Sequence, residues 1–316
     1  MSQQHLTINE RGLIAQYLDE KKKQAQIAKL LGRSRSVISR EIKRNSDKDG
    51  RYYPQRAQKR YEKRRKRCRR RCILETDKKL NKFVSLALRL TLSPEQISHR
   101  YVFRIGTSTI YRAIKKRYIS KECAKKLRHF RYKRGWRKGH KRGQKKDIRR
   151  IQERPEGAKK RTEEGHWELD SIVMRRGIKG RIATFVERKS RYLIAVLLAD
   201  GSAEAMRDAL IFSFQGVPPE MRKSLTADRG SEFSLWRDVE AALPGSLFYF
   251  ADAGKPYQRA TNENTNGLVR QFFPKYRDAV IPTPESVKRA QLLINFRPRK
   301  VLGWKSAISV FSLHLT

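Results

Sequence analysis

The most restrictive feature of this sequence is a series of short apolar and alternating segments between residues 166 and 251. Residues 166–173, HWELDSIV, alternate in polarity, and this period of two is typical of a strand. Two more strands are predicted at 181–186 and 192–198, with short connections that suggest an antiparallel meander. The remaining predicted elements are strands at 224–228 and 247–251 and helices at 202–214, 235–243 and 258–273. This order predicts an α/β domain in which helices flank a mixed five-stranded sheet.

One acidic residue lies inside a predicted strand that is otherwise largely apolar. Asp170 has Leu169 and Ile172 as neighbours, so its carboxylate needs a partner within the fold. Asp228 ends the fourth predicted strand, and Glu263 lies on the helix after the fifth. A central strand, its paired neighbour and a helix across the sheet edge can bring these three carboxylates together.

Three carboxylates held close together repel one another strongly. Mg²⁺ is suited to neutralise them, because it binds a few carboxylates together with waters and phosphate oxygens. Two such ions about 4 Å apart can clamp the attacking and leaving oxygens of a phosphoryl displacement. We therefore expect Asp170, Asp228 and Glu263 to be catalytic residues and ligands of two Mg²⁺ ions, for which Mn²⁺ can substitute. The alternative is that each is an ordinary surface or ion-paired carboxylate, and four other acids compete for the assignment: Glu168, Asp200, Glu232 and Asp252.

The charge of the chain is large and uneven. The 316 residues contain 75 Lys and Arg against 31 Asp and Glu, a formal net charge of +44. Residues 1–160 carry +37 of this charge, and residues 161–316 carry +7. A foldable chain with this charge needs an acidic partner, so we expect the first half to hold a long polyanion.

The sequence also indicates the compartment. No run of 18 apolar residues marks a membrane span, and the first residues lack the apolar core of a secretory signal. The cysteines, Cys68, Cys72 and Cys123, are too sparse for a disulfide framework and favour a reducing compartment. We expect a cytoplasmic protein with no membrane partner.

The first 45 residues predict three short helices. Thr7 and Glu10 can form a capping box at the first, the second covers 24–31 and is broken by Gly32, and the third covers 35–44. A tight turn before a basic final helix matches a helix-turn-helix, whose last helix enters the DNA major groove; a generic three-helix bundle is the alternative. The expected DNA contacts are Arg33, Arg35, Ser36, Ser39, Arg40, Lys43 and Arg44.

A similar arrangement recurs at residues 79–120. Ser93 and Gln96 are suited to cap one helix, and Thr107 or Ser108 can cap another after Gly106. The second of these helices carries outward basic residues. Arg112 and Lys115 are therefore candidate DNA contacts, with structural packing as an equal alternative.

Two basic runs separate these parts. Residues 56–71 contain eleven Lys and Arg, which favours phosphate contact over a solvated linker helix or a localisation signal. Cys68 in this run and Cys72 directly after it lack a second pair of ligands at zinc spacing. Residues 128–150 predict a flexible charged linker, in which Trp136 either stacks on a base or packs against a neighbour. The predicted parts are a helix-turn-helix domain at 1–50, a basic linker helix at 51–78, a second helix-turn-helix-like domain at 79–120, a basic linker at 121–160, and an enzymatic domain with a C-terminal helical segment at 161–316.

Several segments resemble the insertion-sequence-thirty family of bacterial transposases. GHWELD at 165–170 is similar to the family's first-acid motif, and TADRGSEF at 226–233 is similar to its second. YFAD at 249–252 and QRATNENTNGLVRQFFPK at 258–275 resemble the third. NFRPRKVLGWK at 295–305 resembles the C-terminal signature, and residues 28–45 and 186–192 also fit. The resemblance covers nearly the whole chain.

The resemblance implies a ribonuclease-H-like core with Asp170, Asp228 and Glu263 as a DDE triad. It implies metal-dependent cleavage at transposon ends and attack of the freed 3′-hydroxyl on target DNA. A basic residue seven positions after the glutamate, here Arg270, often assists DNA binding in such families and lies on the same helix face. The family commonly has Asn where this chain has Arg229, which would bring a charge toward phosphate.

We therefore expect a DNA transposase that binds terminal inverted repeats and target DNA in the bacterial cytoplasm, associated with the nucleoid when bound. The alternative is a DNA-binding repressor or domesticated factor with an inactive core, which Arg229 supports. A nuclease of RNA–DNA hybrids explains the helix-turn-helix modules poorly. Because two transposon ends must be processed together, we expect a homodimer or larger assembly on DNA, with 80–92 and 292–315 as candidate contacts.

Overall fold

The computed structural model describes residues 5–68, 71–100, 105–128, 148–175, 177–178, 180–275 and 280–312. The contacts within the chain divide it into two compact units, Met1–Arg71 and Cys72–Thr316. The finer division into five parts stays a prediction. Most of the expected linker at 128–150, including Trp136, lies outside the described residues.

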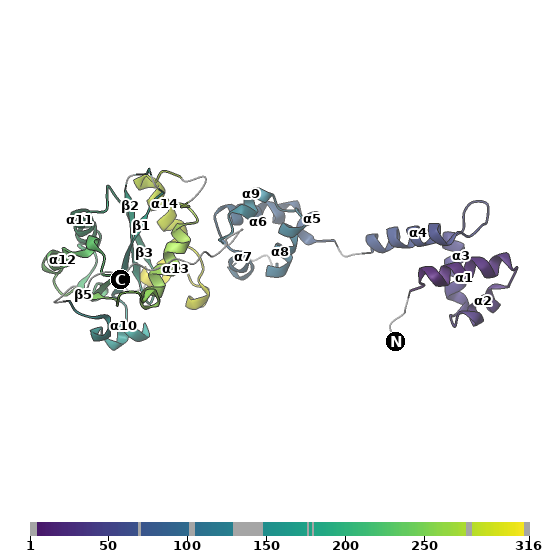
Figure 1. Cartoon of the computed structure of the whole chain (residues 1–316), viewed down its shortest axis with the longest axis horizontal. Helices are drawn as coiled ribbons and strands as arrows, with labels where there is room; N and C mark the ends of the chain where they lie inside the picture. Colours follow the sequence, from purple (N-terminus) through teal and green to yellow (C-terminus); the bar gives the residue numbers. More distant parts are fainter. Residues whose placement is uncertain are drawn as a thin grey trace. The chain divides into compact units, whose positions relative to one another are not determined.

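The unit Met1–Arg71 is helical. Its helices are α1 Ile8–Asp19, α2 Gln24–Leu30, α3 Arg35–Asn45 and α4 Pro54–Arg67 (Figure 1). Thr7 and Glu10 form the predicted capping box at the start of α1. Gly32 has a φ of +61° in the turn between α2 and α3, a left-handed conformation that favours glycine. The three predicted helices are thus confirmed, and α4 follows them.

The apolar sides of these helices meet in a small core. Ile14, Ile27 and Ile38 are fully buried at its centre. Leu13 and Leu30, two apolar residues of these helices, are nevertheless 39% and 55% exposed. A short helix buries only a narrow stripe of its surface against so small a core. The apolar pattern of the sequence therefore suggests more buried side chains than the structure has.

The basic helix α4 has a structural role in addition to its charge. Arg60 Nη1 donates a hydrogen bond to Asn45 O at 2.6 Å, and Arg64 Nη2 donates to Asn45 Oδ1 at 2.7 Å. These bonds satisfy acceptors at the C-terminal end of α3. Part of the basic run that we expected to contact phosphate therefore holds α3 in place.

The unit Cys72–Thr316 begins with a helical module made of α5 Ile73–Thr76, α6 Lys78–Arg89, α7 Pro94–Arg100, α8 Thr107–Lys115 and α9 Lys121–Lys125. Ser93 and Gln96 exchange the predicted capping hydrogen bonds at the start of α7. Gly106 is the N-cap of α8 and no side chain caps it, so the cap predicted at Thr107 or Ser108 is wrong. Both residues already lie within the first turn of α8.

The rest of this unit is built on a mixed sheet with strand order β3-β2-β1-β4-β5. The strands are β1 His166–Val173, β2 Arg181–Glu187, β3 Leu193–Leu198, β4 Ser224–Ala227 and β5 Leu247–Phe250. The pairs β1–β2 and β2–β3 are antiparallel, whereas β1–β4 and β4–β5 are parallel. The predicted meander and mixed five-stranded sheet are confirmed.

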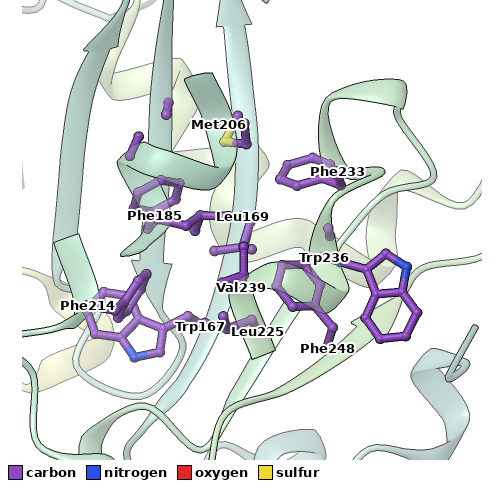
Figure 2. Packing of buried hydrophobic residues seen from close by; sticks show 14 of the residues in the cluster. Trp167, Leu169, Phe185, Met206, Phe214, Leu225, Phe233, Trp236, Val239 and Phe248 are labelled. Carbon is purple, nitrogen blue, oxygen red and sulfur yellow. The ribbon is translucent and has the colours of Figure 1, made fainter. Parts of the chain in front are cut away.

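Helices cover both faces of the sheet (Figure 1). On one face, α11 Ala203–Phe214 and α12 Trp236–Ala242 enclose an aromatic-rich core (Figure 2) that includes Trp167, Leu169, Phe185, Phe214 and Phe248. On the other face, α13 Ala260–Val269 and α14 Pro284–Asn295 cover a second core that includes Ile172, Ile182, Val186, Leu268 and Ile294. Since strand residues alternate between faces, the even-numbered residues of β1 point toward α13.

Short elements complete this unit: the 3-10 helices Ile151–Glu153, Pro219–Met221, Ser231–Phe233, Pro256–Arg259 and Lys300–Leu302, and the helices α10 Glu156–Lys160 and α15 Ala307–Ser312. Ile151 and Ala158 are buried, so residues of the expected linker at 121–160 take part in packing. Across the described ranges, no helix combines the length and apolar character needed to cross a membrane.

Candidate active site

Two predicted site residues lie side by side on the central strands. The parallel register of β1 and β4 pairs Glu168 with Thr226. Continuing this register by two residues brings Asp170 next to Asp228. Neighbouring strands are about 4.8 Å apart, so the two carboxylates are held within a few ångströms of each other.

Both aspartates lie on the face that α13 covers. Leu169 and Ala227, which precede them, are buried in the core under α11. Side chains of successive strand residues point to opposite faces, so Asp170 and Asp228 point away from that core. Each has a side chain that is about one quarter exposed, at 26% and 28% respectively.

Two asparagine side chains form hydrogen bonds that hold α13 against β1 and β2. Asn262 Nδ2 donates hydrogen bonds to Glu168 O at 2.8 Å and to Thr184 O at 3.0 Å. Asn266 Nδ2 donates to Asp170 Oδ2 at 2.9 Å. Residues four apart share a helix face, so this face of α13 lies against the strand that carries Asp170. Neither asparagine is among the site residues predicted from the sequence, although their spacing in a polar stretch is a usable signal.

Glu168 competes with Asp170 in the sequence but has a structural role. It is fully buried, forms an ion pair with Arg188 and accepts a hydrogen bond from the backbone N of Asn262 at 2.8 Å. Arg188 Nε also donates to Ala158 O at 3.0 Å. Burial lowers the pKa of Arg188, and the nearby Glu168 carboxylate opposes this shift. This carboxylate is therefore fully engaged in holding β1, α10 and α13 together.

Arg259 joins the two aspartates. Its Nη1 lies 3.4 Å from Asp170 Oδ2, and its Nη2 lies 3.2 Å from Asp228 Oδ2. Nη1 also donates to Leu169 O at 2.8 Å. Burial raises the pKa of Asp170, Arg259 opposes this shift and the Asp228 charge adds to it. Arg259 is not among the site residues predicted from the sequence, because only the fold shows that it lies between two acids.

Glu263 lies on the same stripe of α13 but is exposed. Arg259, Glu263, Asn266 and Arg270 follow one another at helical spacing, and the other three all contact β1. Glu263 therefore lies on the side of the helix that faces the strand. In the part of the chain that the structure describes, however, no three His, Cys, Asp or Glu side chains are grouped closely enough to hold a metal ion. The structure brings Asp170 and Asp228 together and does not close Glu263 onto them.

The paired aspartates provide part of a ligand set for a divalent cation. Asp170 and Asp228 present two carboxylates, the hard oxygen ligands that Mg²⁺ prefers, and their spacing calls for a positive charge between them. The guanidinium of Arg259 supplies that charge in this structure. Its position shows that the place between the two aspartates accommodates a cation.

The other competing acids have separate partners. Asp200 accepts hydrogen bonds at the start of α11, and Ser171 Oγ donates to Glu232 Oε1 at 3.1 Å. Hydrogen bonds, led by the one from Gln258, lower the pKa of Asp252 to about 2. These contacts favour structural roles for the three acids.

The two basic residues expected near the triad have partners in the fold. Arg229 Nη2 lies 3.6 Å from Asp252 Oδ1. Arg270 Nη2 donates to Val173 O at 2.6 Å, at the end of β1. DNA contact by either residue stays a prediction, and it would require exchanging these partners for phosphate.

Most of the expected DNA-contacting residues of the helical modules are accessible. On α3, Ser39 is partly exposed and five residues are exposed: Arg35, Ser36, Arg40, Lys43 and Arg44. Arg33 precedes that helix, and its Nε lies 2.8 Å from Glu10 Oε1. Arg112 and Lys115 are exposed on α8. The geometry thus leaves a basic surface on α3, from which Arg33 is partly withdrawn.

Comparison with known proteins identifies the family. Residues 2–45 match the helix-turn-helix domain family. The chain is 37% identical to the transposase InsI of insertion sequence element IS30A from Escherichia coli K12, over 96% of this chain and 82% of the relative. It is 32% identical to the transposase of IS1086 from Cupriavidus metallidurans, over 90% and 88%. It is 30% identical to the transposase of IS4351 from Bacteroides fragilis, over 95% and 93%. Identity at this level over most of each chain shows that this chain belongs to the IS30 family of DNA transposases.

Proposed function

We propose that the chain binds the terminal inverted repeats of an insertion sequence, cleaves a strand at their ends and joins the freed 3′-hydroxyl to target DNA. Its sheet and helices form a ribonuclease-H-like core with Asp170, Asp228 and Glu263 as the triad. One observation carries this proposal: the carboxylates of Asp170 on β1 and Asp228, directly after the parallel strand β4, share the guanidinium of Arg259 beneath a helix that bears Glu263 on its facing side.

The triad residues are proposed to hold two Mg²⁺ ions, or Mn²⁺ in their place, which supply charge stabilisation for a phosphoryl displacement when bound. The chain contributes the positions of the ligands. The strands β1 and β4 fix the aspartates, and Asn266 orients Asp170 through the bond at 2.9 Å. Arg259 balances the two negative charges in the free protein.

DNA recognition is assigned to the helical modules. The exposed basic face of α3 fits the major groove, with base or phosphate contacts from its Arg, Lys and Ser residues. Arg112 and Lys115 on α8 are proposed as a second contact. We propose that the protein acts in the bacterial cytoplasm and associates with the nucleoid when bound to DNA.

The triad is tested by nicking and strand-transfer assays with the full-length protein, Mg²⁺ and duplexes that carry the element's terminal repeats. We expect Asp170→Asn, Asp228→Asn and Glu263→Gln each to abolish both activities while DNA binding persists. Asp200→Asn is the matched control, since Asp200 is an exposed acid at the start of α11. Unchanged activity in any triad variant would remove that residue from the triad.

A second function, DNA binding without cleavage, is favoured by the position of Arg259. Its guanidinium already lies between Asp170 and Asp228, and Glu263 is not grouped with them. Such a chain would be a repressor or a domesticated factor. Specific binding to terminal repeats without metal-dependent cleavage supports this function, and cleavage excludes it.

We also propose that a homodimer or larger assembly forms on DNA. The first candidate contact, residues 80–92, is largely occupied, because Leu80, Val84 and Leu88 are buried within the helical module. Leu86 is 55% exposed on the same helix, and Leu292 is 42% exposed on α14. Sedimentation with and without end DNA tests the assembly, and a monomeric active complex contradicts it.

A further inference from the structure

A cavity of about 360 Å³ lies between α13, the start of α7 and the C-terminal segment 298–304. Arg161, Arg191 and Arg299 line it, together with Thr261 of α13 and Trp304. The arginines come from the end of α10, the β2–β3 turn and the segment after α14. We call this space the arginine cavity.

The arginine cavity is separate from the paired aspartates. Thr261, Asn264 and Thr265 line it from α13. At 100° per residue, these positions lie on the opposite side of the helix from Glu263 and Asn266. The helix α13 therefore has one side toward the carboxylates and another toward a cationic space.

The three arginines have only neutral hydrogen-bond acceptors among the described residues. Arg161 Nη2 and Arg191 Nη1 both donate to the one hydroxyl oxygen of Thr261, at 3.2 Å and 2.8 Å. Arg299 Nη2 has a long bond to a backbone carbonyl, that of Ile294, at 3.4 Å. Within the described residues, none of the three forms an ion pair, and their Nε atoms are buried without a hydrogen-bond partner.

The one acidic residue among those lining the cavity does not neutralise them. Glu95 lies 3.2 Å from Lys300 and is about half exposed. Burial and, after it, neighbouring arginines lower the pKa of Arg191 and of Arg299 to about 10. The charges of Glu168 and Glu187 oppose the shift of Arg191 only in part. An anion in the cavity would favour the charged form of both guanidinium groups and so raise both pKa values.

The backbone at this site is also unusual. Arg161, Arg191 and Trp304 have φ values of +59°, +64° and +66°, in the left-handed region that disfavours residues with a Cβ. Arg161 is the residue after the last turn of α10, a position where glycine is the favoured residue. Strained residues that converge on one cavity are typical of ligand sites.

We propose that the arginine cavity binds a phosphate group, and that in the working protein this group belongs to the DNA backbone. Guanidinium groups match phosphate because they offer paired donors in a fixed plane. The assignment to DNA rests on the proposed function, whereas the anion site itself does not. A phosphate held here would fix DNA on the side of α13 opposite the carboxylates.

The first test measures anion binding by thermal unfolding of the full-length protein in inorganic phosphate, against chloride at equal ionic strength. We expect phosphate to raise the unfolding midpoint of the wild type and of the control Arg289→Gln, which removes an exposed charge from α14. In Arg161→Gly the backbone strain is relieved, so its midpoint in chloride should equal or exceed that of the wild type. Its phosphate response should nevertheless be lost, and a retained response would overturn the proposal. Arg191→Gly serves as a second variant with the same expectation.

The second test identifies the source of the phosphate. The logarithm of DNA affinity is plotted against the logarithm of salt concentration, and each phosphate contact contributes a slope of about −0.9. Arg161→Gly and Arg191→Gly should make the slope shallower by about 1 and weaken binding roughly eightfold at 0.1 M salt. Arg289→Gln should leave the slope unchanged. Phosphate-dependent stabilisation with an unchanged slope in the cavity variants would overturn the assignment to DNA.

The outcomes separate this inference from the proposed function. If wild-type protein cleaves DNA and the cavity variants keep the wild-type salt slope, the assignment of the cavity phosphate to DNA fails alone. If no protein cleaves DNA and the cavity variants lose slope, the proposed chemistry fails and the phosphate site stands.

Discussion

Arg259 should control the stability of the paired aspartates and their response to divalent cations. Two carboxylates on adjacent strands, about 5 Å apart, repel by about 3 kcal/mol at an effective dielectric constant near 20. Both side chains are about one quarter exposed, so we take about 2 kcal/mol as the screened value. Arg259→Gln removes the charge that offsets this repulsion. In a unit of this size the unfolding midpoint should fall by roughly 4–8 °C at pH 7.

The pH dependence has a defined sign. Burial raises the pKa of Asp170, and removing Arg259 removes a contribution that lowers it, so this pKa rises further in the variant. An acid with a raised pKa in the folded state loses stability as pH rises from its unfolded value through its folded value. The deficit of Arg259→Gln should therefore be full at neutral pH and shrink as pH falls through the folded pKa of Asp170.

The assay is thermal unfolding of chelator-treated protein, with and without Mg²⁺. Arg259→Lys is the matched control, since it keeps a positive charge near Asp170 and Asp228. We expect Mg²⁺ to raise the midpoint of Arg259→Gln more than that of the wild type, because the guanidinium no longer competes with the metal. Equal stability of the Gln and Lys variants at pH 7, together with equal Mg²⁺ shifts, would refute this reasoning.

Three further predictions concern other parts of the chain. Glu168→Leu should lower the free energy of unfolding in denaturant by about 3–5 kcal/mol, because it leaves Arg188 buried without its ion-pair partner. The double variant Glu168→Leu with Arg188→Met should lose less stability, and an equal loss would contradict the pairing. Arg40→Gln on α3 should make the salt dependence of DNA binding shallower by about 1 without changing the circular dichroism spectrum; an unchanged slope would place Arg40 outside the interface. Gly165→Ala should destabilise the folded protein by about 1–3 kcal/mol, because Gly165 has a φ of +88° and a Cβ would lie 2.6 Å from Glu220 O. An unchanged melting midpoint would show that the backbone relaxes around the added Cβ.

The sheet was predictable because its signal is local. The alternation of polar and apolar residues that predicts β1 lies within eight consecutive residues. Asp170 stands out in that segment because it is an acid among largely buried side chains. Asp228 follows from the same logic, at the end of a short apolar strand. The capping box of Thr7 and Glu10 is equally local, since both partners lie within one helical turn.

The parts that escaped prediction depend on contacts between distant segments. Arg259 acquires its role only because the fold brings it to Asp228 and Asp170, which lie 31 and 89 residues earlier along the chain. The position of Arg229 beside Asp228 in the sequence predicts a contact with phosphate. In the fold, however, Arg229 forms an ion pair with Asp252. The helix α14 was anticipated only as an unspecified C-terminal helical segment, although Thr283 forms a capping box with Ser286 at its start.

The register between β1 and β4 also bears on which changes in chain length the protein tolerates. A one-residue slip of β4 would turn Asp228 into the core beneath α11 and expose Leu225 to the other face. A two-residue slip would keep the face but displace the carboxylate by about 6.6 Å along the strand. We therefore expect the protein to tolerate residues inserted into the loops between α11 and β4. A single residue inserted within β1 or β4 would instead separate the two acids. The apolar core under α11, which touches neither carboxylate, thus fixes the register that keeps the two acids aligned.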